Sequence, residues 1–246
     1  MAKILFKTGT PVLLLALIAL LSGCGGGKRI SDVGKVESYL AQFSGGAKAG
    51  EGGAAAEAPA PAELALKVQL SAENWMAILN SLENAGVQVR LDLSDCKRGN
   101  LTTGGGLRSD GVFDTNVATE YGRKYIAELI LPRTATAIAS GKGENSTLFR
   151  NFTSLKAVSG ENITNIGNLT FSYRKKLKTA NFPKAKVIGE WAFLDTGLTN
   201  ADFPAATSIG EGAFAFCKSL TNANIPKEVK IGTDAFAETP VAGKYR

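Results

Sequence analysis

A short sequence pattern recurs with a period of about 22 residues in the last third of this 246-residue chain. Its units begin at Leu177, Leu198 and Leu220, which lie 21 and 22 residues apart. A fixed period of this length is typical of a solenoid, in which each unit buries its apolar side chains only against its neighbours. Each unit keeps three phrases in place, which are Phe182-Pro183, Phe203-Pro204 and Ile225-Pro226, then Ile188-Gly189, Ile209-Gly210 and Ile231-Gly232, then Ala192-Phe193, Ala213-Phe214 and Ala235-Phe236.

The start of each unit has the pattern of a short strand that proline ends, because proline cannot donate the next ladder hydrogen bond. Leu177, Ala180 and Phe182 are expected to point inward, as are their counterparts in the next two units. The glycine of each Ile-Gly phrase is expected to permit a tight turn. The phenylalanines of the Ala-Phe phrases should stack in adjacent layers. The strand residues expected to face solvent are Thr179, Asn181, Asn200, Asp202, Asn222 and Asn224.

Earlier units are less regular. One begins at Ile126 and spans 29 residues, and the next begins at Leu155 and lacks the proline phrase, so the chain has at least five units. Before them, alternating apolar residues from Leu64, a helix after the N-cap Ser71 and a strand from Val87 predict a strand–helix–strand cap at the N-terminal end. The Gly-rich segment 95–121 is expected to be a long insertion held to the body by Val112 and Phe113. No C-terminal cap is evident.

The phrase Leu-x-x-Ala-x-Phe-Pro, followed by Ile-Gly, by Ala-Phe and once by Cys-x-x-Leu, resembles the BspA-type leucine-rich repeat. The resemblance is close from Leu155 to Phe236 and looser in the Ile126 unit, and the phrase from Val89 to Ser94 is similar to the entry segment of spirochaetal members. It implies an α/β leucine-rich-repeat solenoid of short parallel strands stacked in coils. Members are bacterial surface proteins described as adhesins for host extracellular proteins or other bacteria. The resemblance therefore implies a binding function rather than catalysis.

The first 23 residues predict a signal peptide, with Lys3 and Lys7 before an apolar run that is too short to span a bilayer. The run ends in Leu21-Ser22-Gly23-Cys24, which resembles the lipobox of bacterial lipoproteins. That resemblance implies cleavage before Cys24 and a lipid on its thiol, which would hold the protein to a membrane of the bacterial envelope, at the outer membrane or cell surface. The alternative is an ordinary secretory signal with a chance cysteine.

These features divide the chain into a signal peptide (1–23), a disordered tether (24–63), the cap with its Gly-rich insertion (64–125) and the repeat solenoid (126–246). Within the tether, apolar residues from Lys28 to Phe43 have helical spacing. They predict either a short amphipathic helix near the membrane or a marginal helix that frays.

Composition argues against several kinds of site. The chain contains no histidine, which excludes Ser-His-Asp, Cys-His and His-bearing zinc arrangements. Hydrolysis by a pair of carboxylates stays open, but the Asp and Glu residues are scattered without a visible grouping, and we expect no catalytic residue, metal or cofactor. The Gly104–Gly106 run lacks the Lys-Ser/Thr of a phosphate-binding loop. Cys96 and Cys217 do not make a disulfide framework, and Cys217 is expected to be buried. The net charge of +6 is not concentrated enough to indicate nucleic acid.

Two surfaces are candidates for binding. The six outward strand residues form either a hydrogen-bonding surface for a protein or a solvated ladder that keeps the sheet soluble, and their lack of Tyr, Trp and Arg anchors favours the ladder. Arg174, Lys175, Lys176 and Lys178 form either a site for an acidic glycan or protein, or a solvated charge run. Replacing Arg174, Lys175 and Lys176 with Ala is predicted to weaken binding to heparin-like glycans.

Two functional hypotheses follow. In the first, the protein is a lipid-anchored, surface-exposed repeat protein that mediates adhesion or protein–protein binding without catalysis. In the alternative, it is a periplasm-facing lipoprotein that acts as a structural or assembly partner within the envelope. The ligand and the oligomeric state stay open.

Overall fold

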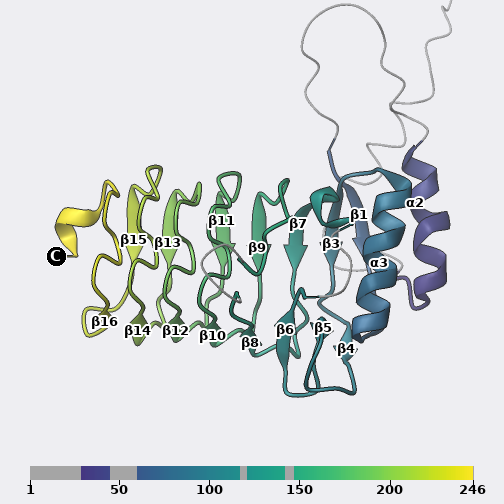
Figure 1. The fold of residues 1–246 in the computed structure, drawn as a ribbon, viewed down its shortest axis with the longest axis horizontal. Helices are drawn as coiled ribbons and strands as arrows, with labels where there is room; N and C mark the ends of the chain where they lie inside the picture. Colours follow the sequence, from purple (N-terminus) through teal and green to yellow (C-terminus); the bar gives the residue numbers. More distant parts are fainter. Residues whose placement is uncertain (1–28, 45–59, 117–120, 142–146, 246) are drawn as a thin grey trace, which may run out of the picture.

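A computed structural model describes residues 29–44, 60–116, 121–141 and 147–245, and the predicted signal peptide and Cys24 lie outside these ranges. The described chain winds into a row of stacked coils with two helices at one end (Figure 1). This is the predicted leucine-rich-repeat solenoid. Among these residues no helix is both long enough and apolar enough to cross a membrane.

One strand from each coil lies on the same side of the molecule, in a five-stranded sheet and a two-stranded sheet that we together call the first sheet. All pairings within them are parallel. It forms the upper row of strands in Figure 1. As predicted, the central Ala180, Ala201 and Ala223 are buried, and the residues on either side of each are exposed. In spatial order the strands are β1 (Ala62–Ala65), β3 (Val89–Asp92), β7 (Ile126–Ile130), β9 (Ala157–Ser159), β11 (Thr179–Asn181), and then the pair β13 (Asn200–Asp202) and β15 (Asn222–Asn224).

The Ile-Gly phrases lie in a second sheet that faces the first across the core. Its isoleucines Ile138, Ile166, Ile188 and Ile209 are buried. All pairings are parallel except the one between β5 and β6. The strands are β5 (Gly106–Leu107), β6 (Val112–Asp114), β8 (Ala137–Ile138), β10 (Asn165–Ile166), β12 (Val187–Ile188), β14 (Ser208–Ile209) and β16 (Lys230–Ile231).

The glycines after these isoleucines serve close packing of the coils rather than the expected turn conformation. Gly189, Gly210 and Gly232 are not among the residues with positive φ. A Cβ on Gly189 would lie 2.5 Å from Asn168 Oδ1 and 2.6 Å from its backbone nitrogen, and one on Gly210 would lie 2.5 Å from the nitrogen of Glu190. Each glycine therefore lets its coil approach the backbone of the preceding coil.

The third side of each coil is a return segment with two positions in the left-handed region. One position holds Leu169, Trp191, Gly212 and Asp234, and the other holds Tyr173, Asp195, Phe216 and Glu238, with φ between 50° and 62°. Most of these residues donate their N–H to the next coil, as Trp191 does to Glu211 O (2.9 Å) and Asp195 to Ala215 O (2.9 Å). Left-handed backbone costs a non-glycine residue about 1–2 kcal/mol, and the bonds between coils offset this cost.

The phenylalanines of successive return segments stack through the interior, as the sequence predicts. The centroids of Phe193 and Phe214 are 5.3 Å apart with an interplanar angle of 3°, and those of Phe214 and Phe236 are 5.2 Å apart at 10°. The stack extends to Phe171 and Phe149 in one direction. In the other direction it ends on Tyr245, whose ring lies 4.6 Å from that of Phe236. Tyr245 also donates its hydroxyl to Ala223 O, so the 3-10 turn η3 (Ala242–Lys244) and Tyr245 act as a small cap that the sequence did not reveal.

At the other end, helix α3 (Ala72–Ala85) closes the stack as predicted. Ser71 caps it by accepting from the Asn74 N–H, and Gly86 ends it with a φ of 66°. Its buried stripe is Trp75, Ile78, Leu79 and Leu82. The short strands β2 (Gln69–Leu70) and β4 (Lys97–Arg98) pair beside its N-terminal end.

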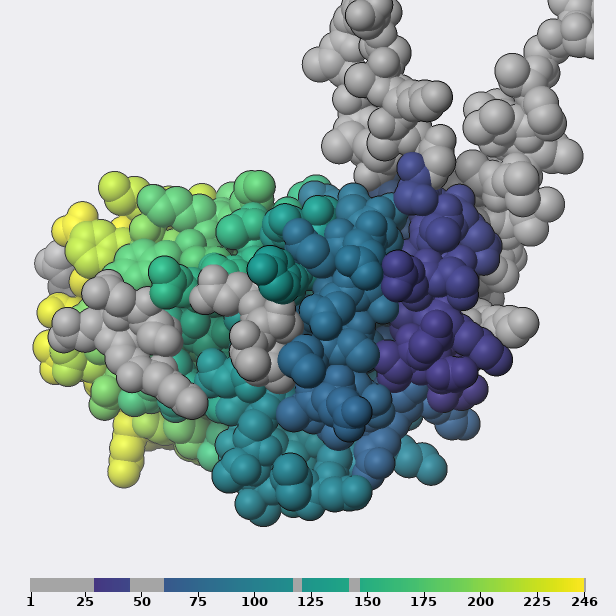
Figure 2. All heavy atoms as spheres, turned by 45° about the vertical axis from the view of Figure 1, so that its right-hand side comes forward, coloured from purple at the N-terminus to yellow at the C-terminus, as the bar shows by residue number. Residues whose placement is uncertain are grey.

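The structure departs from the expected tether, because residues 29–44 belong to the folded cap. The 3-10 turn η1 (Val33–Lys35) and helix α2 (Val36–Ser44) pack against α3, with Val36 and Leu40 fully buried (Figures 1 and 2). Ile30 forms a parallel bridge with Leu66. Apolar contacts with α3 hold this helix, so it is part of the cap rather than a marginal helix that frays. Residues 24–28 and 45–59 lie outside the described ranges.

The Gly-rich segment is also more integrated than an insertion. Its β6 pairs with β8 and so begins the parallel part of the second sheet. Phe113 is buried as expected, and its ring lies 5.7 Å from that of Trp75. After residues 117–120, which lie outside the described ranges, the 3-10 turn η2 (Arg123–Tyr125) leads into β7.

Both cysteines of the described chain are free thiols buried in the core, as expected for Cys217. Burial raises the pKa of Cys96 from 9.0 to about 11, and burial also raises the pKa of Cys217. We expect neither thiol to be alkylated by iodoacetamide in the folded protein at about pH 8, and both to react in guanidinium chloride. Mass spectrometry of the two peptides checks this. Because folding retains the Cys96 proton, its contribution to stability is present below pH 9.0 and is lost as the pH rises towards about 11.

Candidate functional site

The outward residues of the first sheet form two parallel rows, which we call the outer rows. Paired strands place equivalent residues side by side, and neighbouring strands of a sheet lie about 4.8 Å apart. The rows run over the five paired strands from β1 to β11 and continue on the pair β13 and β15, which lies next to β11 without pairing to it. The first row is Glu63, Arg90, Glu128, Ala157, Thr179, Asn200 and Asn222, and the second is Ala65, Asp92, Ile130, Ser159, Asn181, Asp202 and Asn224.

Near the cap the outer rows are charged and internally paired. Arg90 lies 3.2 Å from a carboxylate oxygen of Glu63 and 3.2 Å from one of Glu128. These side chains are all more than a third exposed, so the ion pairs are worth at most about 1 kcal/mol each. The pairing leaves this half of the rows with few groups free for a partner.

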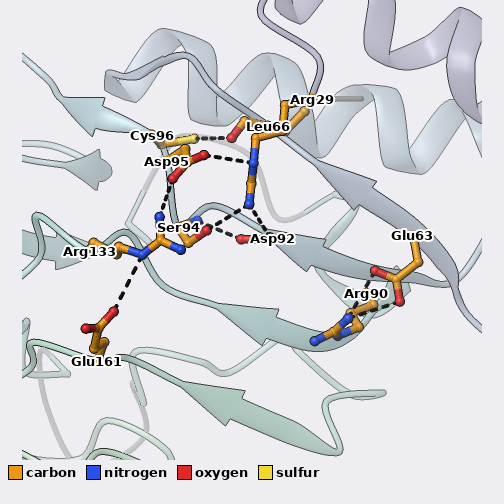
Figure 3. Close-up of polar contacts among 10 residues, drawn as sticks. All are labelled: Arg29, Glu63, Leu66, Arg90, Asp92, Ser94, Asp95, Cys96, Arg133 and Glu161. Carbon is orange, nitrogen blue, oxygen red and sulfur yellow. Dashed lines mark hydrogen bonds and ion pairs between the residues drawn. The ribbon is translucent and has the colours of Figure 1, made fainter. Parts of the chain in front are cut away.

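A second set of ion pairs holds the segment that begins at Arg29 against the C-terminal end of β3 (Figure 3). Arg29 reaches Asp92 at 3.0 Å and Asp95 at 2.8 Å, and Arg133 pairs with both Asp95 and Glu161. Burial disfavours the charged form of Asp92. The hydrogen bonds from Ser94 and Arg29 nevertheless hold the pKa of Asp92 below its usual value. This network explains why the chain from Arg29 onward is held to the body.

Away from the cap, the outer rows carry the six residues predicted from sequence. The structure brings them together on β11, β13 and β15, all exposed. Asn224 donates to Asp202 Oδ1 at 2.7 Å. Within the described residues, the side chains of Thr179, Asn181, Asn200 and Asn222 have no hydrogen-bond partner, so their donors and acceptors face solvent. This half of the rows, which we call the amide rows, is open to a ligand.

Sequence reasoning missed the charged half of the outer rows because its units are irregular. The pairing of β3 with β7 shifts register between Val89 and Arg90, which removes the constant offset found later in the chain. The sequence signal for this charged half was the alternation of Glu63, Arg90 and Glu128 with apolar residues, which indicates that the three charged side chains face outward from their strands.

The structure separates the four predicted basic residues into two kinds. Arg174 is half-buried, and its guanidinium donates to the carbonyl oxygens of Phe149, Arg150 and Ser172. Burial, followed by the nearby charge of Arg150, lowers the pKa of Arg174. Lys175, Lys176 and Lys178 are exposed, and Lys175 pairs with Asp195 at 3.2 Å. Arg174 therefore supports the fold, and its replacement would not isolate an effect on glycan binding.

We expect Arg174→Met to lower the free energy of unfolding by about 1–3 kcal/mol, because the partly buried carbonyls of Phe149, Arg150 and Ser172 lose their donor. Lys176→Met, at an exposed neighbour, should change it by less than about 0.5 kcal/mol. Urea titration followed by circular dichroism measures both. Equal stability of the two variants would contradict a structural role for Arg174.

Among the residues that the structure describes, no group of three or more His, Cys, Asp or Glu side chains could hold a metal ion.

A comparison with protein families agrees with the repeats described above. The model of the BspA type leucine rich repeat region matches residues 124–243 in six copies. Among solved structures, a leucine rich cell surface protein from Faecalibacterium prausnitzii A2-165 is similar, with 19% identity and a TM-score of 0.35. That match covers 54% of this chain and 44% of the other, so the chain spans less than half the length of that protein. A search of the curated proteins gives no match. The coils from residue 124 to residue 243 therefore carry BspA-type leucine-rich repeats.

Proposed function

We propose that this protein is a lipid-anchored, non-catalytic binding protein on the bacterial cell surface, and that its amide rows contact a protein partner. The observation that carries the proposal is the set of exposed polar side chains at equivalent repeat positions of β11, β13 and β15, four of which have no hydrogen-bond partner within the described chain. A fold does not fix a function, so the proposal depends on this surface and on the lipobox-like sequence before Cys24.

The rigidity of the amide rows supports this use. Each row residue follows or precedes a buried alanine in a parallel ladder, so its backbone is fixed before a partner arrives. A partner that hydrogen-bonds to the rows therefore loses little free energy in ordering the protein. The absence of aromatic anchors from the rows predicts a polar interface of modest affinity.

Protease treatment of intact cells tests surface display. Digestion of the protein by added protease, with a periplasmic marker left intact, would support display. Full protection in cells that become sensitive after permeabilisation would instead favour the alternative, a periplasm-facing lipoprotein that acts as a structural or assembly partner.

Replacement of Cys24 with Ser tests the anchor. We expect the variant to move from the detergent phase to the aqueous phase of a detergent partition, because it lacks the thiol that would carry the lipid. Equal partition of the variant and the natural protein would contradict lipidation at Cys24.

The amide rows are tested by the double variant Asn200→Arg with Asn222→Arg. Both residues are exposed, so the fold should persist while the long charged side chains block close contact. We expect loss of binding to those immobilised host extracellular-matrix proteins that capture the natural protein. A control with Val187→Arg and Thr233→Arg adds the same charge at exposed positions away from these rows and should bind normally. Equal loss in both variants would contradict the assignment.

A further inference from the structure

A second surface lies at the edge where the return segments lead into β9 and β11. Arg150, Lys156, Lys175, Lys176 and Lys178 are exposed there, around the half-buried Arg174, and we call these six residues the basic corner. Lys178 N donates to Lys156 O at 2.8 Å, so the two lysines hold the same position in consecutive coils. The guanidinium of Arg174 donates a hydrogen bond to the backbone carbonyl oxygen of Arg150, which connects these two members of the corner.

The basic corner holds most of the excess positive charge of the chain. Its six cationic side chains have one carboxylate partner in the described residues, Asp195, which lies 3.2 Å from Lys175. The full sequence has 28 Lys and Arg residues against 22 Asp and Glu residues. Outside the corner and Asp195, the full sequence has 22 Lys and Arg residues and 21 Asp and Glu residues, which is close to neutral. The corner therefore carries most of the net positive charge of the chain, which favours an anionic partner at this edge.

A shallow hollow of about 260 Å³ lies within the corner. The buried Phe152 and Leu155 form part of its lining, and Tyr173, Lys175 and Lys176 also line it. The side chain of Tyr173 is 48% exposed, although its backbone lies in the left-handed region at a φ of 62°. An apolar floor and a projecting aromatic ring therefore lie next to separate cationic groups.

We propose that the basic corner binds a sulfated polysaccharide, with its sulfate groups near Lys156, Lys176 and Lys178 and a sugar ring against Tyr173. Such a polymer alternates apolar ring faces with anionic groups, as the corner alternates an aromatic surface with cations. A partner with ionic groups alone would leave the apolar lining of the hollow without a contact. The inference rests on the proposed surface display, because only a displayed protein meets a polymer outside the cell.

Heparin, both immobilised and free in solution, is the probe. We compare the natural protein with Lys156→Gln/Lys176→Gln/Lys178→Gln and with a matched control, Lys186→Gln/Lys227→Gln/Lys230→Gln, which removes three exposed lysines elsewhere. The corner variant should bind about tenfold more weakly at about 0.1 M salt and elute earlier, and the control should stay within about twofold. Circular dichroism confirms that both variants are folded.

Tyr173→Asn tests the aromatic contact, because asparagine tolerates the left-handed backbone. It should weaken heparin binding without changing its dependence on salt, whereas the lysine variant should reduce that dependence. Desulfated heparin should not be retained. The proposal is overturned if the natural protein is not retained, if the two lysine variants lose affinity equally, or if a DNA duplex or anionic lipid vesicles bind as tightly as heparin. Protease treatment of cells reports on surface display separately, so failure here leaves that result unaffected.

Discussion

Replacing Phe214 with Ala is expected to lower the free energy of unfolding by about 3–5 kcal/mol. Phe214 is fully buried at the centre of the aromatic stack, with ring centroids of Phe193, Phe203 and Phe236 between 5.2 and 5.6 Å away. Truncation removes these contacts and leaves a cavity that the surrounding coils cannot fill, because their spacing is fixed by two parallel ladders. Urea titration followed by circular dichroism measures the loss.

The matched control is Phe216→Ala in the same coil. Phe216 is 47% exposed, so the same truncation should cost less than about 1 kcal/mol. Similar losses in the two variants would show that the interior stack does not dominate the stability of these coils.

Gly210→Ala should destabilise the protein by about 1–3 kcal/mol although it adds only a methyl group. The new Cβ would meet the Glu190 nitrogen at 2.5 Å and the Gly189 carbonyl carbon at 2.8 Å. These are backbone atoms of the preceding coil, so relief requires the coils to separate. Thermal unfolding should show a lower Tm and, because each coil contacts only its neighbours, a broader transition.

Gly243→Ala provides the control, because a Cβ there has no heavy atom within 4 Å. Its Tm should match that of the natural protein. An unchanged Tm for Gly210→Ala as well would contradict the close approach of the coils.

The regular coils could be predicted from sequence because their constraints are local and repeated. The buried Ala180, Ala201 and Ala223 and the stacked phenylalanines follow from a constant period. The second sheet was only partly predictable, because its strands are two residues long and show no alternation. The constant spacing of the glycines from repeat to repeat is visible in the sequence. Their role depends on the distance between neighbouring coils, and the residue pattern within one coil does not indicate that distance.

The ends of the stack were harder to predict because their partners lie far apart in sequence. Arg29 contacts Asp92 across 63 residues, and no local pattern indicates that pair. The six amide-row residues were identified as exposed strand positions, whereas the structural role of Arg174 was hidden in a run of charged residues. A charge run does not distinguish a solvated lysine from an arginine that satisfies carbonyl groups.

The docking of residues 29–44 changes the reach of an anchored molecule. In a chain lipidated at Cys24, only residues 25–28 separate the lipid-bearing residue from Arg29, and the extended chain from Cys24 to Arg29 spans at most about 18 Å. The glycine- and alanine-rich stretch that follows lies in the sequence between α2 and β1, which both belong to the folded part of the molecule, so it is not part of the link to the lipid. Such a molecule would stand directly on the leaflet, and any ligand would have to penetrate whatever layer covers the membrane in order to reach it.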